Sequence, residues 1–245
     1  MSLKREVIKG IENNEFKLYY QPIINLETNE IAGQEALIRW HHPVDGLRMP
    51  IDFIPQCESD PSIMVELCEF VIKQSWRDLK SLKGDFISVN VAPSSLEQKR
   101  FWDVLEEHSL IGDRPTLFLE ITERSLANYK IIAPHFMRSR ERAIGAFIDD
   151  FGVEQSGFIQ VAKVLNLFPT TDYIKVKLDI EFARNLGDKT YRWFAQSIIS
   201  SMRDCPSGKI DVIVEGIEEI WQRDLFRDYG AKYGQGWLWR KAEPI

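Results

Sequence analysis

Oxygen-bearing side chains stand at or near the ends of several apolar runs in this sequence, where they could act together. They are Glu35 in "GQEALIRW", Asn90 in "ISVNV", Glu120 in "LFLEIT", Asp149 and Asp150 in "IDDFG" and Glu215 in "IVEG", with Lys175 in "YIKV" and Gln235 in "YGQG" at comparable points. Several carboxylates in one place repel each other unless some are protonated or divalent cations hold them together. An all-oxygen set suits Mg2+ or Mn2+ better than Zn2+. The residue types therefore point to a metal centre, provided that the fold brings these run ends together.

Each of these residues, taken alone, has a simpler interpretation. Glu35 lies beside Ala36, Leu37 and Ile38, so its carboxylate would be half buried, and an ion pair with Arg39 would satisfy it. Any single acid of the set could be a solvated rim residue or an ion-pair partner, and Lys175 could be an interior charge that balances acids. The hypothesis of a shared site depends on the position that these residues have in common.

The runs that carry these residues are short and β-rich, and longer helical patterns separate most of them. The strand candidates are "KLYYQPII", "IAGQEALIRW", "FISVNVA", "TLFLEIT", "AIGAFIDD", "DYIKVKL", "IDVIVEG" and "AKYGQGW". The helical patterns run from Ser62 to Leu82, Ser95 to His108, Lys130 to Arg142, Gly157 to Asn166, Tyr191 to Asp204 and Glu219 to Tyr229. This alternation predicts the α/β class and a TIM-type (β/α)8 barrel.

The predicted barrel would gather the polar residues, because the carboxyl ends of its strands form one catalytic face. Only "NLETNE" separates the first two strands. That segment is too short for a helical crossover, so these two strands are expected to pair antiparallel. The prediction is a barrel with one antiparallel strand.

Composition limits the classes of function. The chain has 245 residues, of which 44% are hydrophobic, and carries a net charge of −6. An acidic chain lacks the basic footprint that polymeric nucleic acid requires. No apolar run is long enough to span a membrane, and the charged start lacks the core of a signal peptide, so a cytoplasmic protein without membrane contact is expected. Cys57, Cys68 and Cys205 are too far apart for a CxxC motif.

The sequence resembles the EAL-domain family of cyclic di-GMP phosphodiesterases over nearly its whole length. The segments "YYQPII", "GQEALIRWHHP", "FIPQCE", "ISVNVAPSSL", "LEITE", "IDDFG", "DYIKV", "VEGIE" and "YGQGW" appear in the family's order. The resemblance implies a TIM-type barrel with one antiparallel strand. It also implies metal-dependent hydrolysis of cyclic di-GMP to the linear dinucleotide pGpG, with Mg2+ or Mn2+ in a two-metal site.

The resemblance assigns roles to individual positions. The implied metal ligands are Glu35, Asn90, Glu120, Asp149, Asp150 and Glu215. Lys175 would position or activate the attacking water, with Glu35 and Glu215 also part of the catalytic set. The implied substrate contacts are Gln21, Leu37, Arg39, Gln235 and Glu218, and Glu123 would support a loop. The family also implies a homodimer and an upstream sensory domain in the full-length protein.

Three features depart from the family's pattern. Glu154 in "DDFGVEQSG" stands where a flexible glycine is expected, which would stiffen the loop that delivers Asp150. In "IKVK", Lys177 replaces an aspartate; by alternation it shares a face with Lys175 and would depress metal occupancy. The chain ends at "KAEPI", so residues 1–245 are expected to form one EAL-type barrel domain without the closing C-terminal helix, and residues 1–3 could be left from cloning.

The sequence leaves two functions open. Activity as a phosphodiesterase is favoured because every implied metal-ligand position holds the expected residue type. The alternative is a catalytically idle domain that binds cyclic di-GMP or a protein partner. An unrelated metal-dependent barrel enzyme is disfavoured by the number of ordered matches.

Overall fold

The computed structural model describes residues 3–108, 112–122, 129–139, 142–152, 157–168 and 170–245. Its strands are β1 (Phe16–Asn25), β2 (Ile31–His42), β3 (Gly46–Arg48), β4 (Phe86–Asn90), β5 (Gly112–Ile121), β6 (Arg142–Phe151), β7 (Ile174–Leu178), β8 (Asp211–Val214) and β9 (Tyr233–Gly234). Eight of them close in the order β1-β9-β8-β7-β6-β5-β4-β2, and β3 is an extra strand hydrogen-bonded to β2. The predicted TIM-type barrel is confirmed.

One strand of the barrel is antiparallel, as predicted. β1 pairs antiparallel with both β2 and β9, whereas β2, β4, β5, β6, β7, β8 and β9 pair parallel in turn. The short turn after Asn25 returns the chain directly into β2, which leaves no room for a crossover helix. Seven strands therefore direct their carboxyl ends to the same mouth.

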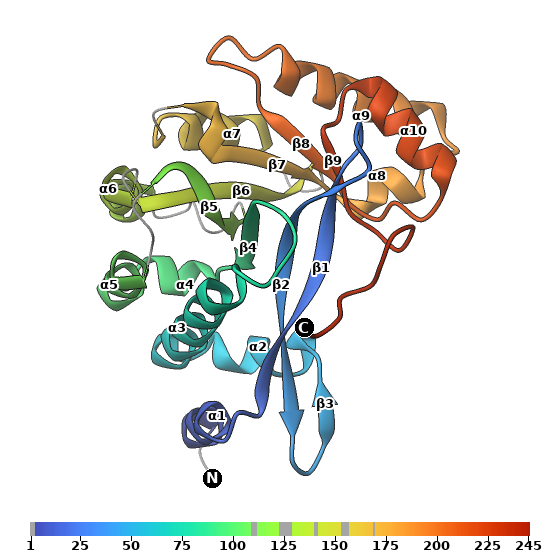
Figure 1. Ribbon diagram of the computed structural model, residues 1–245. Helices are drawn as coiled ribbons and strands as arrows, with labels where there is room; N and C mark the ends of the chain where they lie inside the picture. The colour runs from blue at the N-terminus through green and yellow to red at the C-terminus, as the bar shows by residue number, and fades with distance from the viewer. Residues whose placement is uncertain (1–2, 109–111, 123–128, 140–141, 153–156, 169) are drawn as a thin grey trace.

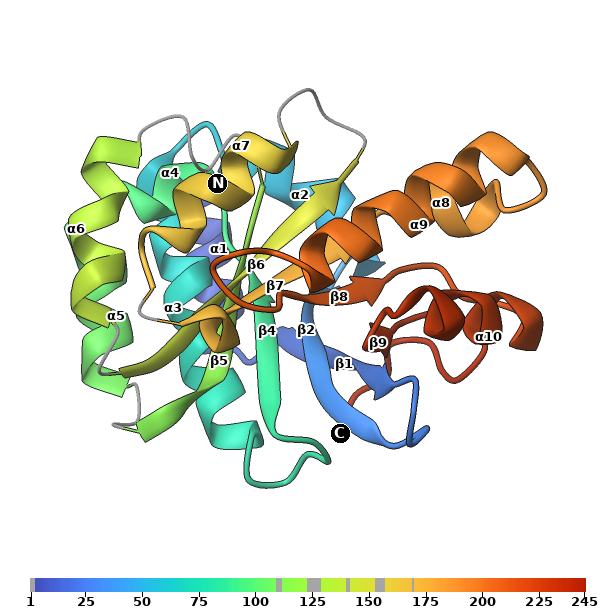
Figure 2. The ribbon, with the colours of Figure 1, turned by 90° about the horizontal axis from the view of Figure 1, so that it is seen from above.

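Helices surround the strands (Figures 1 and 2). They are α1 (Leu3–Glu12), α2 (Pro50–Cys57), α3 (Pro61–Asp78), α4 (Pro93–Leu96), α5 (Lys99–His108), α6 (Tyr129–Ser139), α7 (Gly157–Leu165), α8 (Ile180–Arg184), α9 (Lys189–Arg203) and α10 (Ile220–Tyr229), with a short 3-10 turn at Thr171–Tyr173. The main apolar cluster lies between strands and helices; Val89, Leu119 and Ile148 on the strands and Phe101 and Leu105 on α5 belong to it. Burial of this surface drives the helices onto the barrel. In the described part of the chain, no helix is long and apolar enough to cross a membrane.

A second apolar cluster packs α1, α2 and α3 against Phe16 at the start of β1 and Trp40 near the end of β2. Trp40 is fully buried there, stacked on Phe16 with ring centroids 4.7 Å apart and packed edge-on against Phe53 of α2. The helical patterns expected from the sequence did not include α1 or α2. Both are short, and α2 contains Pro55 within its span.

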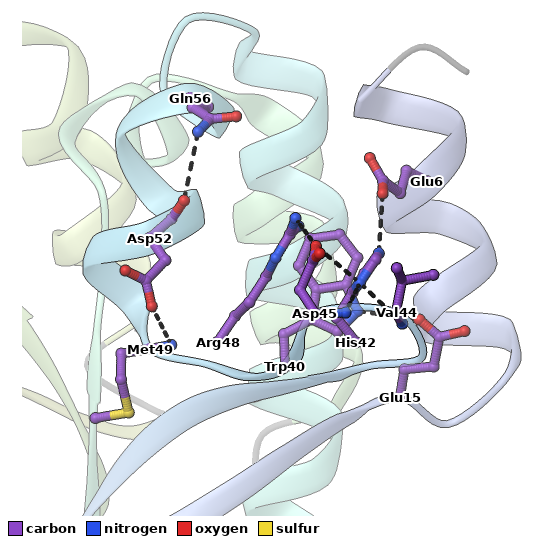
Figure 3. Close-up of polar contacts among 10 residues, drawn as sticks. All are labelled: Glu6, Glu15, Trp40, His42, Val44, Asp45, Arg48, Met49, Asp52 and Gln56. Carbon is purple, nitrogen blue, oxygen red and sulfur yellow. Dashed lines mark hydrogen bonds and ion pairs between the residues drawn. The ribbon is translucent and has the colours of Figure 1, made fainter.

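His42 joins the β2–β3 hairpin to α1 beside this cluster (Figure 3). Its Nε2 lies 3.0 Å from Oε1 of Glu6, and its Nδ1 lies 3.1 Å from Oδ2 of Asp45 and 3.1 Å from the Asp45 backbone nitrogen. Arg48 places its guanidinium over the Trp40 ring, 5.0 Å from the centroid, and contacts Asp45. These contacts fix the hairpin from which α2 begins.

Candidate functional site

The parallel register brings the predicted polar residues to one end of the barrel. Asn90 lies opposite Glu120 on the neighbouring strand, and Glu35 lies opposite Ser88. Glu215 follows β8 directly, and Gln235 follows β9. Residues separated by up to 200 positions in the sequence thus meet at the mouth.

Lys177 sits at the centre of this cluster. Its Nζ lies 2.7 Å from Oε1 of Glu215, 2.8 Å from Oε2 of Glu120, 3.2 Å from Oδ1 of Asp149 and 3.7 Å from Oε2 of Glu35. The residue is 1% exposed, so these contacts replace water around the ammonium group. Alternation predicts that Lys177 shares a face with Lys175; the structure shows that it also reaches four of the residues predicted to bind metal.

Glu35 accepts hydrogen bonds from a residue of β4 and from the residue that follows β9. Asn90 Nδ2 donates to its Oε1 at 3.0 Å, and Gln235 Nε2 donates to its Oε2 at 2.6 Å. The simpler interpretation of Glu35 as the partner of Arg39 is not what the structure shows, because the Arg39 guanidinium donates instead to the Ile38 carbonyl at 2.9 Å. Glu35 therefore belongs to the mouth cluster.

Burial and charge shift the pKa values within the cluster. Burial, reinforced by the charge of Glu35, raises the pKa of Glu120 well above its ordinary value. Burial also raises the pKa of Glu215 to about 7, although Lys177 opposes that shift. Burial alone would lower the pKa of Lys177, but Glu120 and Glu215 raise it well above its ordinary value, so the lysine stays protonated.

Three of these residues could hold a metal ion, whereas the full predicted set could not. EAL domains are typically divalent-metal dependent. Asp149, Asp150 and Glu215 offer carboxylate oxygens that all lie within 4.8 Å of one another, a group that could hold an ion. The larger predicted set does not fit a two-metal arrangement, because the Lys177 ammonium already contacts Glu35, Glu120, Asp149 and Glu215.

Asp150 takes an unusual backbone conformation at the edge of this group. Its φ is 53°, in the left-handed region that residues other than glycine rarely adopt, and the chain turns sharply at Gly152 with φ 99°. Such strain is common at functional sites, where the surrounding structure enforces it. The turn presents the exposed Asp150 side chain to the mouth, where it lines a cavity.

Lys175, predicted to position or activate the attacking water, lies in a different layer of the barrel. Its Nζ is 4.3 Å from the centroid of the Phe118 ring and 5.5 Å from that of Phe86. Burial lowers the pKa of Lys175 to about 8. Among the described residues, no carboxylate lies within ion-pair distance of its Nζ, so the structure does not bring Lys175 to the acids.

A cavity of about 860 Å3 opens beside the carboxylate cluster. Strands β2, β4 and β6 line it with Glu35, Leu37, Asn90 and Asp150. Ile54 of α2, Glu58 just after α2, and Met64 and Leu67 of α3 line the other side. Its size suits a small ligand, and its lining offers both polar and apolar side chains to that ligand. The α2 and α3 residues were missed from the sequence; the only available signal was the amphipathic pattern of α3, which also explains core packing.

The other predicted substrate residues are not among those that line the cavity. Arg39 is 8% exposed, with its guanidinium 5.6 Å from the centroid of the Tyr19 ring. Gln21 is the register partner of Glu35 and donates to the Arg240 carbonyl at 3.3 Å. Glu218 is exposed, and its backbone nitrogen donates to Gln222. Glu123 and Glu154 lie outside the described residues.

Comparison with known proteins identifies the family, since the EAL domain matches residues 4–242. This chain belongs to the EAL domain family. It is 33% identical to the uncharacterised protein Rv1357c of Mycobacterium tuberculosis strain H37Rv, covering 96% of this chain and 78% of that protein. It is 30% identical to PdeB of Escherichia coli strain K12, whose name is "Probable cyclic di-GMP phosphodiesterase", covering 96% of this chain and 44% of PdeB.

Solved structures agree with this assignment. The EAL enzyme Bd1971, solved with cAMP and cyclic di-GMP bound, has a TM-score of 0.82 and 29% identity over 99% of this chain and 66% of that chain. The FimX EAL domain of Pseudomonas aeruginosa, solved with cyclic di-GMP, has a TM-score of 0.80 over 99% of this chain and 97% of that domain. At 18% identity, FimX supports the fold alone. The chain thus spans less than half of PdeB and about two thirds of Bd1971.

Proposed function

We propose that this EAL domain binds cyclic di-GMP in the cavity at the barrel mouth. The observation that carries the proposal is the cavity of about 860 Å3, which the strands of the EAL barrel line with Glu35, Leu37, Asn90 and Asp150. Leu37, a predicted substrate contact, lies on this wall. The cyclic di-GMP bound to the similar enzyme Bd1971 supports the choice of ligand.

Arg39 is the residue expected to recognise a phosphate or a guanine face. Burial lowers the pKa of its guanidinium, yet an arginine stays charged at neutral pH. The described residues place no carboxylate within ion-pair distance of it, and one of its donors is used by the Ile38 carbonyl. A buried guanidinium with donors to spare is suited to an anionic ligand.

Hydrolysis to the linear dinucleotide pGpG is the second candidate. One observation favours it, namely that Asp149, Asp150 and Glu215 keep carboxylate oxygens close enough for a metal ion. The contacts of Lys177 with Asp149 and Glu215 count against it, so binding without turnover is the better supported function.

Calorimetric titration of cyclic di-GMP into the protein, with and without Mn2+, tests the proposal. Arg39→Ala should weaken binding by about tenfold, because a charge-assisted hydrogen bond contributes at least about 1.5 kcal/mol. Arg77→Ala is the matched control, since Arg77 is exposed on the side of α3 that lines another hollow. The absence of binding by the parent protein would refute the proposal.

Turnover assayed on the same samples separates the two candidates. The parent should bind cyclic di-GMP and form no linear dinucleotide beyond a no-enzyme blank, with or without Mn2+. Rapid Mn2+-dependent turnover that Asp150→Asn abolishes would establish hydrolysis instead. The homodimer and the upstream sensory domain stay predictions; light scattering on this chain would check the first.

A further inference from the structure

The carboxylate ring at the mouth already contains a cation. Within 3.7 Å of Lys177 Nζ stand carboxylate oxygens from four elements: Glu35 on β2, Glu120 on β5, Asp149 on β6 and Glu215 after β8. An ammonium group can donate three hydrogen bonds, and here its short contacts all go to carboxylates. Among the described residues, no other cationic side chain lies within ion-pair distance of these four carboxylates.

The position of Nζ is the position that an ion bound by the same four acids would need. A divalent ion coordinates oxygens at about 2.0 to 2.6 Å, so it would have to lie inside the space that Nζ fills. The side chain of Lys177 is 2% exposed and is fixed on β7 between parallel neighbours, so it cannot leave the ring by a simple rotamer change into water. An ion at Asp150 would still lie beside the ammonium group, because Asp149 and Glu215 are shared.

We propose that Lys177 takes the place of the divalent metal ions in the carboxylate ring, so that this EAL domain holds its mouth together without metal. The residue fills the position of an aspartate in the family's lysine, apolar, aspartate pattern. One substitution thereby removes a carboxylate and supplies a cation. A further consequence, that cyclic di-GMP binds equally well with and without metal, rests on the proposed function.

Electron paramagnetic resonance of Mn2+ titrated into metal-stripped protein tests the inference without any nucleotide. The parent should leave Mn2+ free at concentrations at which Lys177→Asp binds it. That variant should bind Mn2+ on the order of a hundredfold more tightly, because it removes a positive charge from the ring and adds a negative one. Its melting temperature should rise with Mn2+ and fall with a chelator, whereas that of the parent should respond to neither.

Lys177→Arg is the matched control, since it keeps the positive charge and should bind Mn2+ no better than the parent. Tight Mn2+ binding by the parent that Asp150→Asn removes would overturn the inference. Equal Mn2+ affinity in the parent and Lys177→Asp would also overturn it. If Lys177→Asp does not fold, the titration of the parent decides. Loss of cyclic di-GMP binding, by contrast, would refute only the proposed function.

Discussion

Lys175 and Lys177 are two residues apart on β7, and both are buried inside the barrel, yet their surroundings have little in common. The Lys177 ammonium is ringed by four carboxylates. The Lys175 ammonium lies among the rings of Phe86, Phe118 and Tyr233. The pKa of Lys177 is raised and that of Lys175 is lowered to about 8. One step along the interior of the strand therefore separates a layer of charge from a layer of aromatic side chains.

The two layers follow from the alternation of each strand. Phe86, Phe118, Phe147, Ile213 and Tyr233 fill the aromatic layer. Two residues after four of these positions stand the polar residues of the mouth. Glu120 follows Phe118, Asp149 follows Phe147, Glu215 follows Ile213 and Gln235 follows Tyr233 in this way. Gly33 leaves room for the aromatic layer, because a Cβ atom at this position would lie about 2.3 Å from the Phe86 ring. The aromatic layer fills the barrel interior, and the charged layer forms the mouth.

The largest expected effect is that of Lys177→Met, which removes the charge and keeps the chain length. The free energy of unfolding in metal-free buffer should fall by about 3 to 5 kcal/mol, since the buried carboxylates lose their cation. Urea unfolding measures this change. Millimolar Mn2+ should restore part of the loss, because the emptied ring can then bind an ion. A variant as stable as the parent would show that the carboxylates do not depend on Lys177.

Lys175→Met should act in the opposite direction and stabilise the protein by about 1 to 3 kcal/mol at pH 7, because burial of the ammonium costs free energy. The unfolded chain binds a proton at Lys175 up to about pH 10.5, and the folded chain only up to about pH 8. The unfolded state binds more protons between these values, so the parent gains stability as the pH rises through this window.

The stability difference between Lys175→Met and the parent should therefore shrink between pH 8 and pH 10.5. Urea unfolding of both proteins at pH 7 and pH 10 checks this, and the use of a difference removes the contribution of other titrating groups. A constant difference, or a variant less stable than the parent, would contradict the assigned environment of Lys175.

The smallest effect is the coupling between Lys177 and one of its partners. A double-mutant cycle of Lys177→Met and Glu120→Gln should give a coupling free energy of about 2 kcal/mol, since the pair is fully buried at 2.8 Å. The exposed pair of Lys99 and Asp103 on α5, at 2.7 Å, is the control and should couple by less than about 0.5 kcal/mol. Similar values for both pairs would mean that burial adds nothing to the ion pair.

The sequence predicted the barrel because its signals are local and repeated. Short β-rich runs alternate with helical patterns, and "NLETNE" alone was enough to predict the antiparallel start. Alternation also placed both lysines on one face. It could not say which layer each ammonium reaches, because that depends on the stagger between neighbouring strands.

The cavity was harder to predict than the carboxylate cluster. Asn90 and Asp150 lie at the ends of β4 and β6, which are recognisable in the sequence, and Glu35 lies within β2. Ile54 and Met64 reach the cavity only because α2 and α3 pack beside the extended β2. No local pattern distinguishes an apolar residue that lines a cavity from one that fills the core.

The contacts of Lys177 determine how the mouth responds to ions in solution. A bound ion leaves and returns according to its concentration, and a chelator or a competing ion can remove it. An ammonium group attached to the chain is present at an effective concentration that dilution cannot change, so its occupancy follows from folding alone. On this proposal the cation of the mouth is in place when the barrel closes, and the ion content of the solution does not set its occupancy.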